Sequence, residues 1–225
     1  MNNTILYIIE VAGTMAFAIS GIRLAAKRQF DLFGAYVVGL VSAIGGGTIR
    51  DVMLGVTPVW MEHPIYIIVT AISLLFVIVA GRHLPRFVRT FFLFDTIGLA
   101  LFTTVGITKS LNAEFPMWVA ITMGVVTGSF GGVVRDMLTG ELPLIFRHDI
   151  YALASFLGGI FFAVLSHCGV DATTTSMFVI ASIILMRLIA VKYHLQLPIL
   201  NSSQRHGASD TTISLHRKPR NFDNE

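Results

Sequence analysis

The sequence predicts an all-α integral membrane protein with seven transmembrane helices, built from a duplicated three-helix unit and one further helix. Three observations lead to this prediction. Only 13% of the 225 residues are charged and 54% are hydrophobic, whereas soluble domains carry about 25% charged residues. The apolar residues form seven runs of about the length that crosses a bilayer. A glycine-rich motif ending in Arg-Asp occurs twice, with Arg50 and Arg135 separated by 135 − 50 = 85 residues.

The duplication keeps one register without a gap from Glu10 to Tyr151. At this offset Glu10 faces Asp95, and Gly46-Gly47 faces Gly131-Gly132. Each repeat holds three helices, an odd number, so the second copy must enter the membrane from the opposite side. We therefore expect a 3+3 inverted-topology repeat, with these parts: repeat 1 over 4–81, repeat 2 over 91–166, a seventh helix over 174–193, and a polar, disordered cytoplasmic tail over 198–225.

Each expected helix is an apolar run bounded by polar or helix-breaking residues. Basic residues close the first and third runs, and Pro58 and Pro143 follow the two glycine motifs. Tyr66 and Tyr151 open the helices after these prolines, and we interpret them as anchors at the membrane surface. The expected helices are Thr4–Ala25, Leu32–Leu54, Pro64–Gly81, Phe91–Thr108, Met117–Leu138, Ile150–Ser166 and Thr174–Tyr193.

The distribution of Lys and Arg predicts the orientation of the chain. Basic residues concentrate in the first, third and fifth loops and after the last helix, whereas the other side holds only Arg50 and Lys109. Because cytoplasmic loops are enriched in Lys and Arg, we expect the N-terminus outside and the C-terminus in the cytoplasm.

The two glycine motifs predict local breaks in their helices. A glycine in a helix interior costs about 1 kcal/mol relative to alanine, so we expect kinks or unwinding at Gly45–Gly47 and at Gly131-Gly132. Freed carbonyls are suitable ligands for a dehydrated monovalent cation, provided that they line a water-filled path. We expect no tight metal site, but transient K⁺ contacts at Gly45, Gly46 and Gly131. Nearby hydroxyls that could add oxygens are those of Ser42, Thr48, Thr127 and Ser129.

The alternative is that the glycines only allow close helix packing, which is common in membrane proteins. We favour a pore or substrate site, because both copies are followed by Arg-Asp and belong to one inverted repeat.

The charged residues of the motifs offer two interpretations. Arg50 and Asp51 are sequence neighbours that do not face each other on a helix, so we expect each to pair elsewhere. The candidate pairs are Arg50 with Asp136, Arg135 with Asp51, or the two arginines with Glu10 and Asp95. Ionisable residues at membrane depth indicate function, for example in gating, but these could also hold helices together or reach the membrane surface.

Other classes of function find no support in the sequence. The chain contains no nucleophile motif, P-loop or dinucleotide fingerprint, so we expect no enzyme and no cofactor beyond a permeating K⁺ or Na⁺. One cysteine cannot form a disulfide framework. There is no basic stripe with exposed aromatic residues, so we expect no nucleic-acid partner.

The motifs GGGTIRDVMLG at Gly45–Gly55 and GGVVRDMLTGELP at Gly131–Pro143 resemble those of bacterial relatives of the trimeric intracellular cation (TRIC) channels. The resemblance implies a homotrimer in the bacterial inner membrane, among lipids, with a potassium-permeable path in each protomer. Carried over by position, the conduction residues are Gly45, Gly46, Gly47, Thr48, Gly131 and Gly132. Phe130, opposite Gly45, departs from the glycine pattern and is either a hydrophobic gate or a space-filling residue.

Many members of this family are labelled as transporters of glycine or another small amino acid. A secondary transporter is therefore the alternative to a channel, and a scaffold without transport activity is the third possibility. Inverted repeats suit alternating access as well as conduction.

Overall fold

The computed structural model describes residues 3–80, 87–147 and 150–197, and for 87–89 it describes the backbone alone. His148, the repeat counterpart of His63, lies outside the described residues, as do Gly81 and the expected polar tail over 198–225. The described chain is helical, with eight α-helices and one 3₁₀ helix. They are α1 (Asn3–Lys27), α2 (Leu32–Met53), α3 (Val59–Glu62), α4 (Ile65–Ala80), α5 (Phe87–Asn112), α6 (Met117–Leu138), η1 (Leu144–Phe146), α7 (Ala152–His167) and α8 (Ala172–Lys192).

All seven predicted helices occur at the expected places, but the number of clear membrane spans is smaller. Five helices are long and apolar enough to cross a membrane: α1, α2, α5, α6 and α8. Helices α4 and α7 have 16 residues each, or about 24 Å at 1.5 Å per residue, against a hydrocarbon core of about 30 Å. The short α3 was not anticipated. The protein is therefore an all-helical membrane protein with five clear spans and two shorter apolar helices.

The 85-residue repeat in the sequence is also a repeat in the structure. Moving the bounds of α2 by 85 residues gives those of α6, and the first residue of α3 moves in the same way to the first residue of η1. Helices α2 and α6 each end shortly before a glycine in the left-handed region, Gly55 at φ 73° after α2 and Gly140 at φ 66° after α6. Glycine adopts this conformation without the penalty that a Cβ would add. The repeated sequence therefore gives repeated helix ends.

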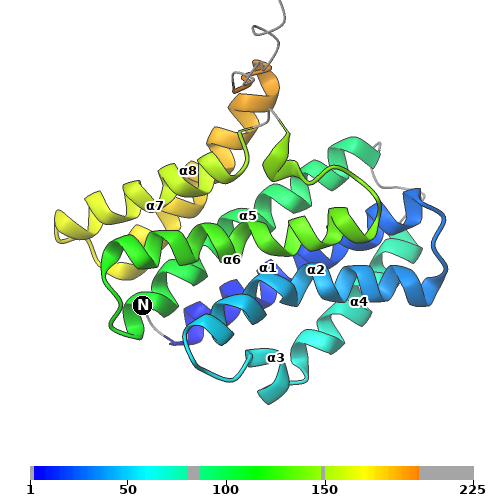
Figure 1. Cartoon of the computed structure of the whole chain (residues 1–225), viewed down its shortest axis with the longest axis horizontal. Coiled ribbons are helices and arrows are strands. Elements are labelled where there is room, and N and C mark those ends of the chain that lie inside the picture. Colours follow the sequence, from blue (N-terminus) through cyan, green and yellow to red (C-terminus); the bar gives the residue numbers. More distant parts are fainter. Residues whose placement is uncertain (1–2, 81–86, 148–149, 198–225) are drawn as a thin grey trace, which may run out of the picture.

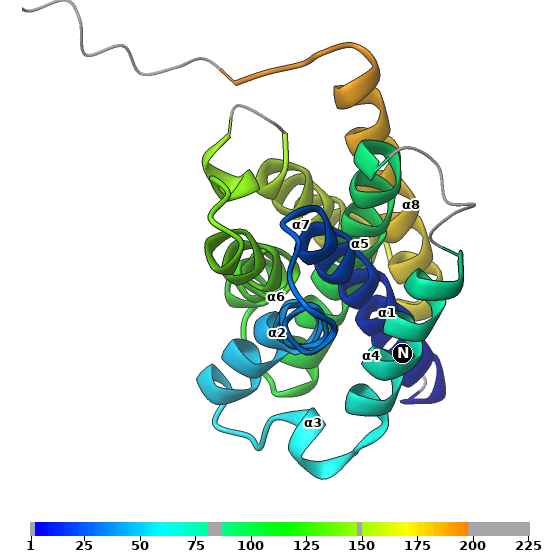
Figure 2. The same cartoon turned by 90° about the vertical axis from the view of Figure 1, so that its right-hand side faces the viewer.

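Four helices form the centre of the molecule, and the remaining ones cover its two sides. Helix α1 contacts α2 and α5, and α6 contacts the same two helices. Helix α4 packs against α1 and α2, whereas α7 packs against α5 and α6, and α8 packs against α5 and α7. Figures 1 and 2 both show α3 and α4 on the side opposite to α7.

Glycines bring the paired helices of each repeat close together. A Cβ on Gly21 would lie 2.9 Å from the Val38 carbonyl oxygen on α2, and one on its counterpart Gly106 would lie 2.8 Å from the Met123 carbonyl oxygen on α6. Between the repeats, Phe17 and its counterpart Phe102 stack with ring centroids 5.6 Å apart. The two halves therefore meet about an approximate two-fold axis.

Candidate ion pathway and its charged clusters

Helices α2 and α6 cross in direct backbone contact at the glycine motifs. A Cβ on Gly46 would collide with the Thr127 carbonyl oxygen, and one on Gly131 would collide with the Ser42 carbonyl oxygen. These two contacts are repeat counterparts, because Ser42 and Thr127 are also 127 − 42 = 85 residues apart. Gly46 and Gly131 thus allow α2 and α6 to pack in backbone contact.

The expected unwinding at the glycine motifs is wrong. Helix α2 is α-helical from Leu32 to Met53 and α6 from Met117 to Leu138, so no unwound segment frees carbonyls there in this conformation. Packing of both helices against several neighbouring helices offsets the low helix propensity of glycine. The hydroxyls expected to add oxygens each donate to the carbonyl four residues earlier: Ser42, Thr48, Thr127 and Ser129.

The other predicted pathway residues surround this crossing. A Cβ on Gly45 would lie 3.6 Å from the Gly131 Cα, in ordinary contact. Gly47 and Gly132 instead face charged side chains: the nearest atom to a Cβ on Gly47 would be Arg50 Nη2, at 3.6 Å, and Arg135 Nη2 would lie 3.5 Å from one on Gly132. Phe130 is half-buried on α6.

The first charged cluster comprises Glu10, Arg50, Asp51, Tyr66 and Lys109. Arg50 is 1% exposed; its Nε donates to Asp51 Oδ1 at 2.7 Å and its Nη2 to Glu10 Oε1 at 3.4 Å. Lys109 from α5 lies 2.6 Å from the same Glu10 oxygen, and the Tyr66 hydroxyl donates to Glu10 Oε2 at 3.3 Å. Two carboxylates and two cations therefore balance in charge at the end of α2.

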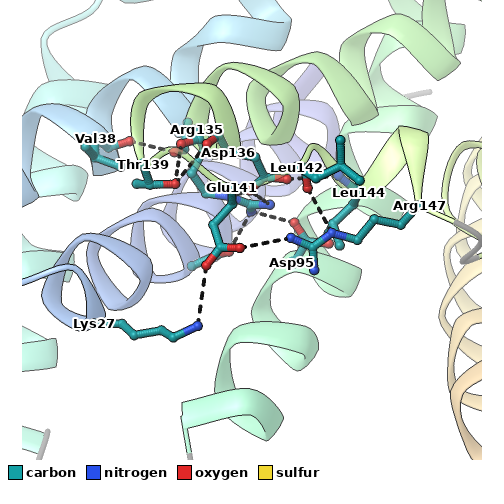
Figure 3. Close-up of polar contacts among 12 residues, drawn as sticks. Lys27, Val38, Asp95, Arg135, Asp136, Thr139, Glu141, Leu142, Leu144 and Arg147 are labelled. Carbon is teal, nitrogen blue, oxygen red and sulfur yellow. Dashed lines mark hydrogen bonds and ion pairs between the residues drawn. The ribbon is translucent and has the colours of Figure 1, made fainter. Parts of the chain in front are cut away.

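The second charged cluster comprises Asp95, Arg135, Asp136, Tyr151 and Arg187, and Figure 3 shows part of it. Arg135 is 0% exposed; its Nε donates to Asp136 at 2.8 Å and its Nη1 to Asp95 at 2.6 Å. Nη1 also donates to the Ser20 hydroxyl of the other repeat at 2.8 Å. Arg187 from α8 supplies the second cation, 3.4 Å from Asp95, and its guanidinium lies over the Tyr151 ring at 4.8 Å.

The pairing of the arginines was predicted correctly in one respect and wrongly in another. Both arginines pair with the acid of the first helix in their own repeat, which was one of the candidates. They also pair with the neighbouring aspartate, which the sequence argument excluded. That argument holds for Cβ directions, but the long arginine side chain turns its Nε back toward the next residue.

Each of these aspartates also fixes the short helix that follows. Asp51 Oδ2 accepts a hydrogen bond from the Val59 amide at 3.1 Å, and Asp136 Oδ2 accepts one from the Leu144 amide at 3.0 Å. A carboxylate at the beginning of a helix compensates its unpaired amides and its positive dipole end. The Arg-Asp pair therefore connects the charged cluster to α3 or to η1.

Sequence reasoning missed several members of the clusters. Tyr66 and Tyr151 are 5% and 1% exposed, so their interpretation as surface anchors is wrong; their match in the repeat was the available signal. Lys109 and Arg187 gave a weaker signal, as single basic residues near the ends of apolar runs. No spacing rule connects them to Glu10 or Asp95, because they come from helices outside the motif.

A cavity adjoins the first cluster beneath Trp60 of α3. Its walls include Glu10, Thr48, Arg50, Trp60, Tyr66 and Phe102. The centre of a water molecule has about 20 Å³ in which to move, which suffices for one water. The Trp60 indole N–H donates to the Thr48 hydroxyl at 3.0 Å and holds α3 over the cavity.

A third group of charges joins the loops at the ends of α1 and α6. Lys27 and Arg28 lie 3.4 and 3.0 Å from Glu141 Oε1, and Arg147 lies 3.3 Å from Oε2; Figure 3 shows Glu141 between Lys27 and Arg147. Partial burial alone would raise the pKa of the Glu141 carboxyl, but Arg28, Lys27 and Arg147 outweigh it and hold the pKa below its usual range.

The fold and the clusters together define a polytopic helical membrane protein in which a duplicated unit encloses polar groups. The family model described as "Glycine transporter" matches the chain twice, over residues 7–82 and 92–167. These matches begin 92 − 7 = 85 residues apart, at the offset of the repeat. The chain therefore belongs to this family, which includes the bacterial relatives of the TRIC channels.

Relatives and solved structures agree with the family assignment. The UPF0126 inner membrane protein YadS of Escherichia coli K12 is 41% identical over 199 residues, covering 86% of this chain and 95% of the relative. The TRIC channel orthologue from Rhodobacter sphaeroides has a similar structure, with a TM-score of 0.81 and 32% identity. The match covers 86% of this chain and 100% of the orthologue. A second solved structure, described as the structural basis for conductance through TRIC cation channels, has a TM-score of 0.75 and 29% identity. The match covers 86% of this chain and 96% of that one. The protein is thus a multi-pass bacterial inner membrane protein.

Proposed function

We propose that this protein is a homotrimeric, potassium-permeable cation channel with one path in each protomer. The observation that carries the proposal is the paired contact at Gly46 and Gly131, with a charged cluster beyond each end of it. Similarity to solved TRIC cation channels supports conduction, and their trimeric name supports the trimer. In this proposal the glycine crossing is the closed constriction, and α2 must separate from α6 for ions to pass.

The predicted orientation gives the path a direction. With the N-terminus outside, the first charged cluster faces the outside and the second faces the cytoplasm. The inverted repeat, with three helices in each copy, relates the two clusters. Transient K⁺ contacts at Gly45, Gly46 and Gly131 would then belong to the open conformation, in which the carbonyls and hydroxyls of the crossing reach water. Lipids surround the trimer.

The test is a comparison of alanine variants in planar bilayers under a KCl gradient. Gly46→Ala or Gly131→Ala adds a Cβ that must push the opposite backbone away, so we expect a larger resting potassium current. Gly45→Ala is the matched control, because its Cβ meets only the Gly131 Cα at 3.6 Å. Size-exclusion chromatography with light scattering checks that each variant remains a trimer. Unchanged current in folded Gly46→Ala and Gly131→Ala trimers would contradict the assignment of the constriction.

A carrier for glycine or another small amino acid is the second candidate. The description of the matching family model favours it, as does the charge balance of the first cluster. Counterflow of labelled glycine in liposomes, without single-channel steps in bilayers, would support the carrier over the channel.

A further inference from the structure

A second cavity lies away from both charged clusters, where α5 and α7 end and α8 begins. Its polar walls are Thr108 and Asn112 of α5, Ser166 of α7 and Thr175 of α8. Its volume is about 140 Å³, similar to that of an engineered cavity of about 150 Å³ that binds benzene. The cavity therefore has room for a molecule of about six non-hydrogen atoms.

One wall of this cavity carries a buried hydroxyl without a hydrogen bond. Thr108 is 4% exposed, and its Oγ1 has no partner among the described residues. Thr104 and Ser110, on the same part of α5, each donate to the carbonyl four residues earlier. Thr96 Oγ1 also lacks a partner, but Thr96 does not line this cavity. Because an unpartnered buried hydroxyl is costly, a ligand that donates to or accepts from Thr108 would be stabilised.

The other polar walls provide an exposed mouth and a second buried hydroxyl. Asn112 and Ser166 are exposed, whereas Thr175 is 0% exposed. Thr175 Oγ1 donates to the Val170 carbonyl at 3.4 Å, and a hydroxyl that donates can still accept. A ligand can therefore enter between Asn112 and Ser166 and reach two hydroxyls at the inner end.

The charge of the walls restricts what this ligand can be. Among the described residues, no charged side chain lines the cavity. The first repeat has Arg23 at the position of Thr108, so this part of the second repeat is neutral where the first is basic. Asp171, just before α8, accepts a hydrogen bond from the Thr174 amide at 2.9 Å and caps its own helix. An ion would lose hydration here without gaining an opposite charge, so the cavity favours a neutral ligand.

The remaining walls favour a ligand with carbon atoms over a group of waters. Phe162 is 3% exposed, and Leu111, Val170 and Ala172 complete the apolar part of the cavity. A buried water typically makes about three hydrogen bonds, and waters against these apolar walls would lack partners. A small ligand can instead place C–H groups against Phe162 and direct its hydroxyls to the polar walls.

We propose that this cavity binds a small neutral polyol of about the size of glycerol. One of its hydroxyls would bind Thr108, a second would bind Thr175, and its carbon chain would lie against Phe162. The site belongs to the second half alone, because the wall that α8 supplies has no counterpart in the duplication. The proposal goes beyond cation conduction and does not depend on it.

Saturation-transfer NMR with glycerol tests the proposal on the full-length protein, purified without glycerol. We expect transfer to the glycerol protons that saturates with concentration and is absent from empty detergent micelles. 1,3-Propanediol, which lacks the middle hydroxyl, should bind about fivefold more weakly, as expected for loss of one hydrogen bond between neutral groups. Absence of transfer would overturn the proposal in favour of a site for water only. Displacement of glycerol by KCl but not by choline chloride would overturn it in favour of a cation site.

Two variants locate the binding site. Thr108→Val removes the hydroxyl and keeps a similar shape, so it should weaken glycerol binding by about fivefold. It should not lower the unfolding temperature, because the lost hydroxyl has no partner among the described residues. Thr104→Val, one turn earlier and outside the cavity, is the matched control that should keep full binding.

Ser166→Phe changes an exposed residue, so it should fold and obstruct the mouth of the cavity whether or not Thr108→Val folds. We expect this variant to abolish the saturable transfer. Undiminished glycerol binding by the folded Thr108→Val or Ser166→Phe protein would overturn the assignment of the site.

Discussion

The two charged clusters show how one repeated motif gives two different sites. Both contain an acid from the first helix of the repeat, an Arg-Asp pair and a tyrosine, in one register. They differ in the second cation: Lys109 is 20% exposed, whereas Arg187 is 3% exposed. Arg187 comes from α8, which lies outside the duplication. The unduplicated helix therefore gives the second cluster a buried cation, whereas the second cation of the first cluster reaches solvent.

The repeat also differs at a few positions within its register, and these differences agree with that asymmetry. The first cluster has the longer acid, an indole and a hydroxyl stand where the second repeat has two aliphatic side chains, and a valine corresponds to Ser20. The pairs, first cluster before second, are Glu10 and Asp95, Thr48 and Val133, Trp60 and Ile145, and Val105 and Ser20. Three predictions test whether the two clusters differ in this way, and a fourth concerns the exposed charges around Glu141.

Loss of the central arginine should have the largest effect. Arg135→Gln leaves Asp95 and Asp136 with less compensation in a fully closed site, so we expect a loss of about 3–5 kcal/mol in stability. Arg50→Gln should cost less, because the first cluster has a cavity that can admit water. Thermal unfolding in detergent measures both, and equal losses would contradict the comparison.

Removal of the second cation should also affect the second cluster more strongly. Arg187→Gln loses a buried contact to Asp95 and one to the Ile150 carbonyl, for which we expect about 2 kcal/mol. Lys109→Gln should cost about 1 kcal/mol, because Lys109 reaches solvent and Arg50 still neutralises Glu10. A larger loss for Lys109→Gln would reverse the assignment of which cluster is the closed one.

Substitutions at Ser20 and at its repeat counterpart Val105 test the comparison of the two clusters further. Ser20→Ala removes an acceptor from Arg135 and should cost about 1 kcal/mol. Val105→Thr keeps the shape of the side chain and offers Arg50 a hydroxyl, so we expect it to be neutral or stabilising, against the usual cost of a buried hydroxyl. Val179→Thr, also at a fully buried valine, is the control that should destabilise.

The loop contact at Glu141 should have the smallest effect. Its pKa is depressed in the folded protein, so the carboxylate stabilises the fold above its unfolded pKa, and this contribution disappears as the pH falls through the folded pKa. Because the partners are exposed, Glu141→Gln should cost less than about 1 kcal/mol at pH 7. The difference between wild type and variant should vanish as the pH falls below the folded pKa of Glu141, and it should shrink in high salt. Unfolding curves over pH and salt can measure both effects.

Much of the fold could be read from local sequence. The apolar runs, the prolines after them and the glycines at 55 and 140 locate the helices, because each signal acts within a few residues. The duplication was visible for the same reason: it needs only a comparison of the chain with itself. The helix α5 extends beyond its predicted bounds at both ends, since Arg and Asn there continue a helix that packing already supports.

The site was less accessible to sequence reasoning. The glycines at 45–47 and 131–132 indicated weak helices, yet both helices remain intact. Glycine lets α2 and α6 touch, and this packing offsets the low helix propensity of glycine. The sequence limited the partners of Arg50 and Arg135 to a few candidate acids, but it did not show which of these acids each arginine contacts. Trp60, Lys109 and Arg187 carried no local pattern that assigns them to a cluster.

The sequence by itself determined the membrane class, the repeat and most helix bounds, because hydrophobic length, turn residues and self-similarity are local properties of the chain. Only the tertiary structure decided that the glycines are contact points and that the two clusters differ. Those features depend on which helices approach one another, and α8 packs against α5 and α7 of the second half. The same Arg-Asp motif therefore meets a buried arginine at one end of the molecule and a partly exposed lysine at the other.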